Sequence, residues 1–280
     1  MINRLIRYIE YLTGLKNSNT LRKIQSEIFV KKIREESKTD LINFGWKFYS
    51  QNDEDGIINE IFRRIKTTNK FFVEIGSGGG YENNTLNLLC EGWQGAWIDA
   101  NTDYIKKYEK TLASKIPKNC LQLLEIKLNS KNTNFLKNKL NIPDEIDFLS
   151  LDIDSHETDI LENLNFSPRV ICVEYNAKFR ENFKFKFSED ERSDIESDFW
   201  GNSLSSLNDC LDKKGYSLIG CNITGVNAFF VKKELAIDNF YLSNDLRDFY
   251  MPPRYYLSYL FSSSDGSLET ILKRIRNKHH

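Results

Sequence analysis

Carboxylate and amide side chains stand at the ends of several short apolar runs in this 280-residue chain. Such groups bind ligand hydroxyls and cations, and as a set they can hold a hard metal ion. The residues concerned, in chain order, are Glu74, Asp99, Asp152, Asp154, Glu174 and Asn176. A single acid at a strand end is usually a cap or a surface group. Five carboxylates brought together would repel one another, so they need ligand hydroxyls, a metal or hydrogen-bond donors between them.

A glycine-rich segment follows the first of these runs. The run Phe71–Ile75 is apolar apart from Glu74, and the glycines that come next are Gly76, Gly78, Gly79 and Gly80. Because no Cβ is in the way, the backbone amides of such a turn can approach a ligand closely. A helix is expected to begin near residues 83–85, with its N-terminus directed at the same place. A glycine-rich loop without a ligand is the alternative, but the flanking strand, acid and helix favour a binding site.

A polar turn, residues 50–55, precedes a helical pattern whose apolar face begins at Ile57. Asn52 or Asp53 can cap this helix, and the acids of the turn suit its N-terminal dipole. The functional interpretation is that the turn, which includes Gln51, lies across the mouth of the glycine loop.

A regular alternation of expected strands and helices positions these residues. Strands are predicted at 71–75, 95–99, 121–128, 147–153, 170–175, 216–221 and 228–232, and helices at 85–91, 103–112, 134–140, 157–164 and 203–211. Strands alternating with helices predict βαβ units and an α/β fold, with a mostly parallel sheet covered by helices on both faces. Ligands of such sheets bind at the carboxyl ends of the strands, where the polar side chains collect.

The chain divides into three expected parts. Residues 1–40 form a helical extension, residues 41–235 the α/β domain, and residues 236–280 a C-terminal extension with a closing basic helix. The terminal helices are expected to pack on the domain or on a second subunit, which would make a homo-oligomer; weak contact with a membrane surface is the alternative. Within the domain, residues 177–202 are a long insertion, which predicts a lid or an acceptor-binding loop.

The bulk composition limits the classes of partner and compartment. The net charge of -1 gives no electrostatic reason to expect a nucleic-acid partner. The five cysteines are scattered without a CxxC pair, so neither a zinc site nor a disulfide framework is predicted. No segment has the apolar length of a signal peptide or a membrane span. A reduced cytoplasm therefore fits best.

The glycine motif distinguishes between two nucleotide ligands. In the dinucleotide fingerprint GxGxxG a third glycine would fall at Tyr81, so a dinucleotide-dependent oxidoreductase is disfavoured. The observed pattern is ExGxGxG with an acid, Asp99, about 25 residues further on, and a carboxylate there can accept both hydroxyls of a ribose. This pattern resembles the class I S-adenosylmethionine-dependent methyltransferases.

Five segments in order narrow the resemblance to the FkbM-type methyltransferase family. They are SQNDEDGII, FVEIGSGGGYENNT, LSLDIDSHETDIL, RVICVEYNA and SLSSLNDCLDKKGYSLIGCNITGVNAFFV, spanning roughly residues 44 to 235. One difference is Ser155-His156-Glu157, where a glycine commonly follows the acidic pair in relatives. The resemblance implies a Rossmann-like class I methyltransferase fold, with a mostly parallel seven-stranded sheet, a C-terminal antiparallel strand and helices on both faces.

The resemblance also implies roles for individual residues toward S-adenosylmethionine. Along the methionine part would lie Glu74, Gly76, Gly78 and Gly80, and Asn84 and Thr85 match the pair that caps the helix beside it. Asp99 would bind the ribose, and the turn at residues 129–130 would lie near the adenine.

Methyl transfer to a hydroxyl needs an aligned acceptor and removal of its proton. His156 is a candidate base because imidazole titrates near neutrality, and the alternative is an exposed histidine at a helix start. A divalent cation such as Mg²⁺ is the other candidate activator, with Asp154 and its neighbours as ligands. The full set of candidate ligands is Asp152, Asp154, Glu174 and Asn176.

The family resemblance implies an O-methyltransferase that acts on a hydroxyl of a sugar, a polysaccharide or a glycosylated small molecule. Two alternatives stay open at this point: the dinucleotide-dependent oxidoreductase, and a non-catalytic cofactor-binding scaffold that assembles with other proteins through its terminal helices.

Overall fold

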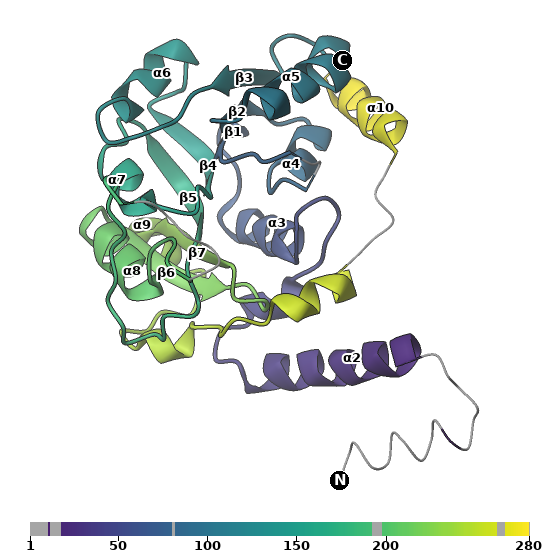
Figure 1. Ribbon diagram of the computed structural model, residues 1–280, viewed down its shortest axis with the longest axis vertical. Helices are drawn as coiled ribbons and strands as arrows, with labels where there is room; N and C mark the ends of the chain where they lie inside the picture. The colour runs from purple at the N-terminus through teal and green to yellow at the C-terminus, as the bar shows by residue number, and fades with distance from the viewer. Residues whose placement is uncertain (1–10, 12–17, 80–81, 192–197, 262–266, 280) are drawn as a thin grey trace. The chain divides into compact units, whose positions relative to one another are not determined.

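The structure is a computed structural model that describes residue 11 and residues 18–79, 82–191, 198–261 and 267–279. The chain divides into two compact units, Met1–Ser37 and Lys38–His280. Within the first unit, helix α2 spans Ser18–Glu36 (Figure 1). The second unit contains the sheet, and residues 236–280 belong to it.

A seven-stranded sheet forms the centre of the second unit, in the order β3-β2-β1-β4-β5-β7-β6. Strand β7 runs antiparallel to both β5 and β6, and the other neighbours are parallel. The strands are β1 (Phe71–Ile75), β2 (Gln94–Asp99), β3 (Leu121–Glu125), β4 (Glu145–Leu151), β5 (Ser167–Glu174), β6 (Tyr216–Cys221) and β7 (Asn227–Lys232). This topology confirms the predicted Rossmann-like α/β fold with its antiparallel C-terminal strand.

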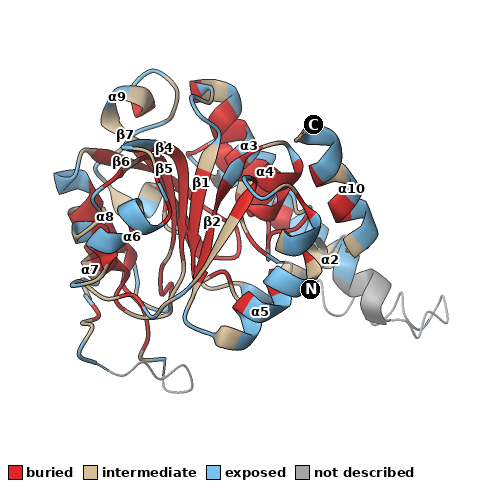
Figure 2. Cartoon of the chain, turned by 90° about the horizontal axis from the view of Figure 1, so that it is seen from above, coloured by how far each residue is buried: buried red, intermediate tan, exposed pale blue. Residues whose placement is uncertain are grey.

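Helices cover both faces of this sheet. Figure 2 shows the buried strands between α3, α4 and α10 on one side and α6, α7 and α8 on the other. The helices of this unit are α3 (Glu54–Ile65), α4 (Leu86–Cys90), α5 (Thr102–Thr111), α6 (Leu136–Lys139), α7 (Glu157–Glu162), α8 (Leu204–Lys213), α9 (Lys233–Ala236) and α10 (Leu268–Lys278). Short 3₁₀ helices lie at Leu41–Phe44, Ala113–Lys115, Thr133–Phe135, Leu246–Asp248 and Tyr255–Phe261.

The central strands are mainly apolar and almost fully buried because both of their faces are covered. Six of the seven β4 residues have no or almost no exposed surface, among them Phe148 and Leu149 at 0 %. Burial on both faces is what turns a strand into a continuous hydrophobic run rather than an alternating one. None of the helices in the described part of the chain combines the length and apolarity that a membrane-spanning helix needs.

Gly76 lets the first strand end directly beside the fourth. Its φ is +82°, and a Cβ at this position would lie 1.5 Å from the Asp152 carbonyl oxygen. The Gly76 N–H donates to the Ile98 carbonyl oxygen at 2.9 Å, which joins this turn to β2. A residue with a side chain would push the two strand ends apart, so the glycine brings the loop after β1 and the acids after β4 to one place.

Candidate functional site

Two adjoining cavities lie at the carboxyl edge of the sheet. The larger, of about 430 Å³, extends from the end of β2 to the loop after β4; the smaller, of about 240 Å³, lies over β1 and β4. Gly76, Gly78 and Asp152 line both of them. The two cavities therefore share a wall, and one elongated ligand can occupy both.

The larger cavity combines apolar walls with one carboxylate at the end of β2. Ile98, Ile126 and Leu128 contribute apolar surface, and Asp99 stands among them. Asp99 Oδ2 accepts from Gly78 N and Asp99 Oδ1 accepts from Asn101 N, each at 2.8 Å. Each carboxylate oxygen has a second lone pair, so Asp99 can still accept hydrogen bonds from ligand hydroxyls while the backbone holds it in place.

The smaller cavity is lined by acids and amides. Its lining is Gln51, Glu74, Gly76, Ser77, Gly78, Gly79, Glu82, Asn84, Ser150, Asp152 and Asn227. These residues include three carboxylates and no lysine, arginine or histidine. Gln51 comes from the polar turn before α3, which was predicted to lie across the glycine loop. Gly80 and Tyr81 lie outside the described residues.

Glu74 is held by the start of α4 rather than left free for a ligand. Asn84 N donates to Glu74 Oε1 at 2.9 Å, and the Thr85 hydroxyl and N–H both donate to Glu74 Oε2. The start of this helix does lie at the glycine loop, since Asn84 lines the smaller cavity, and the N–H groups of Asn84 and Thr85 bind the Glu74 carboxylate there. Thr85 lines neither cavity and acts through Glu74, whose pKa burial raises to about 7.

Three of the four predicted metal-ligand residues come together. Asp152, Asp154 and Glu174 each offer a carboxylate oxygen, and these oxygens lie within 4.8 Å of one another. Burial raises the pKa of Asp152 to about 7, and burial together with the nearby Asp152 raises the pKa of Glu174 well above its ordinary value. Glu174 Oε2 is buried without a hydrogen-bond partner. Asp152 and Glu174 thus tend to hold protons near neutral pH unless a cation is bound.

The side chain of the fourth predicted ligand, Asn176, is hydrogen-bonded to the insertion. Its Nδ2 donates to the carbonyl oxygens of Trp200 at 2.9 Å and Asp198 at 3.1 Å, and its Oδ1 accepts from Lys178 N at 3.0 Å. Asn176 therefore secures the two ends of the 177–202 insertion, and the carboxylate trio is the better candidate for a cation.

His156 is buried, so the alternative of an exposed helix-opening histidine is wrong. It is 6 % exposed and lines the larger cavity together with Asp154. Its Nε2 lies 3.2 Å from the Leu128 carbonyl oxygen. A carbonyl can only accept, so Nε2 carries the proton and Nδ1 is the nitrogen that can take one. Leu128 borders the same cavity, which places His156 on its apolar side.

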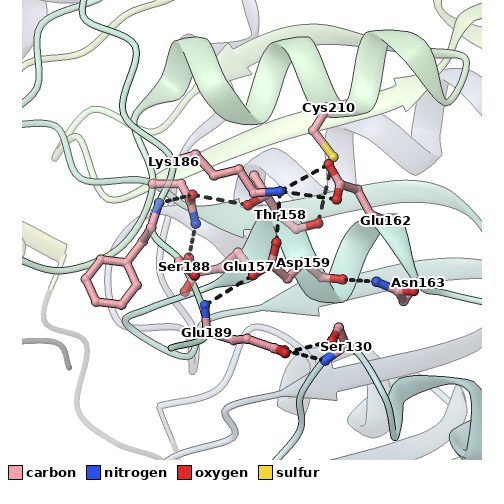
Figure 3. Close-up of polar contacts among 12 residues, drawn as sticks. Ser130, Glu157, Thr158, Asp159, Glu162, Asn163, Lys186, Ser188, Glu189 and Cys210 are labelled. Atoms are coloured by element: carbon pink, nitrogen blue, oxygen red, sulfur yellow. Dashed lines mark hydrogen bonds and ion pairs between the residues drawn. The ribbon is translucent and has the colours of Figure 1, made fainter. Parts of the chain in front are cut away.

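The insertion reaches across α7 to the loop after β3, as Figure 3 shows. Ser130 donates to Glu189 through both its N–H, at 2.8 Å, and its hydroxyl, at 2.9 Å. Lys186 forms ion pairs with Asp159 and Glu162 of α7. Ser130 was expected near an adenine, but it lines neither cavity and binds the insertion instead. The described part of the insertion is therefore attached to α7 and to the loop after β3, and none of its residues is among those that line the larger cavity.

Asn202 was missed by the sequence reasoning, although it ties the insertion to the site. It is fully buried, and its Nδ2 donates to the Ser155 carbonyl oxygen at 3.0 Å and to Glu157 Oε2 at 2.7 Å. Its Oδ1 accepts from Phe187 N at 2.9 Å. An asparagine just before the Ser203 cap of α8 carries no sequence signal of its own, since its partners are 15 to 47 residues away.

No family model matches this chain, and no curated protein matches it. Among solved structures, a provisionally assigned caffeoyl-CoA O-methyltransferase from Staphylococcus aureus is 15% identical, with 81% of this chain and 98% of that chain covered and a TM-score of 0.46. The glycopeptide N-methyltransferase MtfA complexed with (S)-adenosyl-L-methionine is 13% identical, with 62% and 86% covered and a TM-score of 0.36. A SAM dependent methyltransferase from Aquifex aeolicus is 16% identical, with 62% and 87% covered and a TM-score of 0.34. These likenesses are too distant to carry a function, which is inferred below from the cavities.

Proposed function

We propose that this protein is an S-adenosylmethionine-dependent methyltransferase. The observation that carries the proposal is the pair of adjoining cavities at the carboxyl edge of the sheet. The larger has apolar walls at the end where Asp99 stands, which suits an adenosine, and Asp152 and Asp154 line its other end. The smaller is lined by acids and by glycines, which suits an amino-acid tail that carries an ammonium and adjoins a sulfonium.

The same chemistry argues against a dinucleotide. A pyrophosphate at the glycine loop would lie among the carboxylates of Glu74, Glu82 and Asp152, which line the smaller cavity. Like charges in a buried site repel strongly. The Gly78 N–H, which would bind a phosphate oxygen in such a site, is already donated to Asp99. A cationic cofactor stabilises the ionised form of these acids, whereas a phosphate destabilises it.

The affinity for S-adenosylmethionine is expected to rise with pH. Glu74 and Asp152 both have a pKa of about 7, above their unfolded values, so each binds a proton below that pH in the free protein. A bound cation favours the ionised acids, so affinity should increase between about pH 6 and pH 8 and then level off. S-adenosylhomocysteine lacks the sulfonium and should show a shallower slope. Titration calorimetry of both ligands across this range measures the difference; equal slopes would contradict it.

Within the proposed reaction, the cofactor supplies an electrophilic methyl group when bound, and the chain aligns an acceptor and moves its proton. The acceptor class we propose is a hydroxyl of a sugar, polysaccharide or glycosylated small molecule, following the FkbM-type resemblance of the sequence. Asp154 and His156 line the larger cavity together with Asp152, which borders both cavities, so both are candidates to move that proton. His156 Nδ1 is the candidate base.

A divalent cation is the second candidate activator. The residues present fit a hard cation, since Asp152, Asp154 and Glu174 supply three oxygens and Glu174 Oε2 has no protein donor. These three carboxylates would hold the ion, and it would supply stabilisation of an alkoxide.

Magnesium binding tests that candidate directly. Calorimetric titration of Mg²⁺ should give heat with the wild type, no heat with Asp154→Ala, and unchanged heat with Asp238→Ala, an exposed acid outside the site. If the wild type gives no heat, the proposal of a metal at this site is wrong, and the carboxylates share protons instead.

The proposed activity is tested by turnover. The purified full chain is incubated with S-adenosylmethionine and a pool of free sugars, polysaccharides and glycosides, and S-adenosylhomocysteine is quantified. Acceptor-dependent product that falls at least about 100-fold in Asp154→Ala supports the proposal, a size typical of losing a catalytic acid or base. Cofactor binding without turnover on any acceptor would favour the scaffold alternative.

A further inference from the structure

A buried carboxylate joins the turn before α3 to the β6–β7 hairpin. Glu54 is 0 % exposed, and its carboxylate accepts from Asn52 N at 2.8 Å and from Asn52 Nδ2 at 3.1 Å. Asn222 Nδ2 and Asn227 Nδ2 donate to the same Glu54 oxygen, Oε1, at 2.8 and 3.0 Å. Four amide N–H groups thus converge on one buried acid, and two of them come from the hairpin.

This arrangement fixes which end of the Asn227 amide faces the smaller cavity. A carboxylate only accepts hydrogen bonds, so the NH₂ end of Asn227 must face Glu54. The opposite end, Oδ1, is then the part of the amide that is left for the cavity that Asn227 lines. Asn222 is fixed in the same way, because its Oδ1 accepts from Val226 N and Asn227 N at 2.9 Å. The orientation of Asn227 is therefore set by its partners.

The smaller cavity consequently presents hydrogen-bond acceptors from two sides. Glu74 and Asp152 are carboxylates in its lining, and Asn227 adds an amide oxygen from the far strand. At the rim, Lys47 is paired with Glu82 at 2.9 Å and donates to the Gln51 carbonyl oxygen, so its charge is already engaged. A ligand group that fits between these acceptors must donate several hydrogen bonds and carry positive charge. An ammonium meets both requirements.

We propose that Asn227 Oδ1 accepts a hydrogen bond from the ammonium of the cofactor's amino-acid tail, and that Glu54 is the positioning residue that orients this amide. The inference rests on the proposed function, since it names the part of the cofactor that this strand recognises. A hydroxyl of the methyl acceptor is the other donor that could reach Asn227, and the ligands chosen below separate the two.

Two nucleoside ligands distinguish these roles. S-adenosylhomocysteine has the amino-acid tail, whereas 5′-methylthioadenosine has the same nucleoside without it. In Asn227→Ala, calorimetry should show S-adenosylhomocysteine bound about ten-fold more weakly, the loss of one charge-assisted hydrogen bond, and 5′-methylthioadenosine within about two-fold of wild type. The matched control is Thr224→Ala. This variant removes the hydrogen bond that Asn222 Nδ2 donates to the Thr224 hydroxyl, which belongs to the same buried network, and Thr224 lines neither cavity. It should leave both affinities unchanged.

The positioning role of Glu54 has its own readout. Glu54→Ala frees the Asn227 amide to rotate and should weaken S-adenosylhomocysteine selectively, as Asn227→Ala does. Glu54→Gln keeps one oxygen that can accept from Asn222 and Asn227 and loses only the hydrogen bond from Asn52 N, so it should restore the ratio of the two affinities. A purely structural role would lower both affinities together and would not be rescued selectively.

Each outcome has a definite meaning. A selective loss of S-adenosylhomocysteine in Asn227→Ala, with rescue by Glu54→Gln, supports the proposal. An equal loss of both ligands, or no loss of either, overturns it, and the second result would assign Asn227 to the acceptor side. If the wild type binds neither nucleoside, it is the proposed function that fails, and this is seen before any variant is compared.

Discussion

Asp99→Ala is expected to weaken the binding of S-adenosylhomocysteine by about 100-fold, because hydrogen bonds to a charged group each contribute about 1.5–3 kcal/mol. Two effects combine in this variant. The ribose loses a carboxylate acceptor, and Gly78 N loses the partner that holds the glycine loop at 2.8 Å. Calorimetry at constant pH measures the change, with circular dichroism to show that the fold is retained.

The matched control for this variant is Asp103→Ala. Asp103 is an exposed acid four residues further on, in the first turn of α5, and it lines neither cavity. It should bind the ligand as the wild type does. If Asp99→Ala also keeps wild-type affinity, the larger cavity is not the nucleoside site.

Asp147→Ala is expected to cost about 3–5 kcal/mol of unfolding free energy, the range seen when one partner of a buried ion pair is removed. Asp147 is 0 % exposed and lies at the amino end of β4, away from the cavities. It accepts from Arg169 Nη1 at 2.6 Å and from the backbone N–H groups of Thr68, Asn69 and Lys70. Removing the Asp147 carboxylate leaves the nearly buried Arg169 guanidinium without its ion-pair partner. It also leaves the backbone N–H groups of the turn that leads into β1 without their acceptor.

Urea unfolding measures this change, and the control is Asp144→Ala. Asp144 pairs with Lys137, but its side chain is 92 % exposed, so water replaces the partner and stability should hardly change. Equal midpoints for the Asp147 and Asp144 variants would show that the buried pair does not hold the amino edge of the sheet together.

The sheet was predictable because each strand has a local pattern in the sequence. The mainly apolar segment 71–75 was predicted as a strand and is β1, and the strand predicted at 147–153 is found two residues earlier, as β4 at Glu145–Leu151. The closing basic helix that was predicted in the C-terminal extension is α10, Leu268–Lys278. The carboxyl edge follows from the same logic, since residues at the ends of parallel strands must meet there. For this reason Asp152, Asp154 and Glu174 were predicted as neighbours.

The direction in which each side chain points was not predictable in the same way. Glu74 lines the smaller cavity but is also bound by Thr85, and His156 is buried against Leu128 rather than exposed. These choices depend on partners that the fold brings close. The bond from Asn227 to Glu54 joins residues 173 positions apart, and no local pattern marks either residue as a partner of the other.

The insertion illustrates the same limit. Its length and position predicted a lid, but its described part attaches through Glu189 to Ser130 and through Lys186 to α7. Those contacts depend on complementary charges across separate loops, which sequence spacing does not encode. Only the three-dimensional arrangement shows that this segment is attached to α7 and to the loop after β3.

The central claim is that the two cavities hold S-adenosylmethionine and not a dinucleotide. Calorimetric titration of the wild-type full chain with S-adenosylhomocysteine and, separately, with NAD tests it most directly. We expect saturable binding of S-adenosylhomocysteine with one site per chain and no binding of NAD. Binding of NAD without binding of S-adenosylhomocysteine would contradict the assignment.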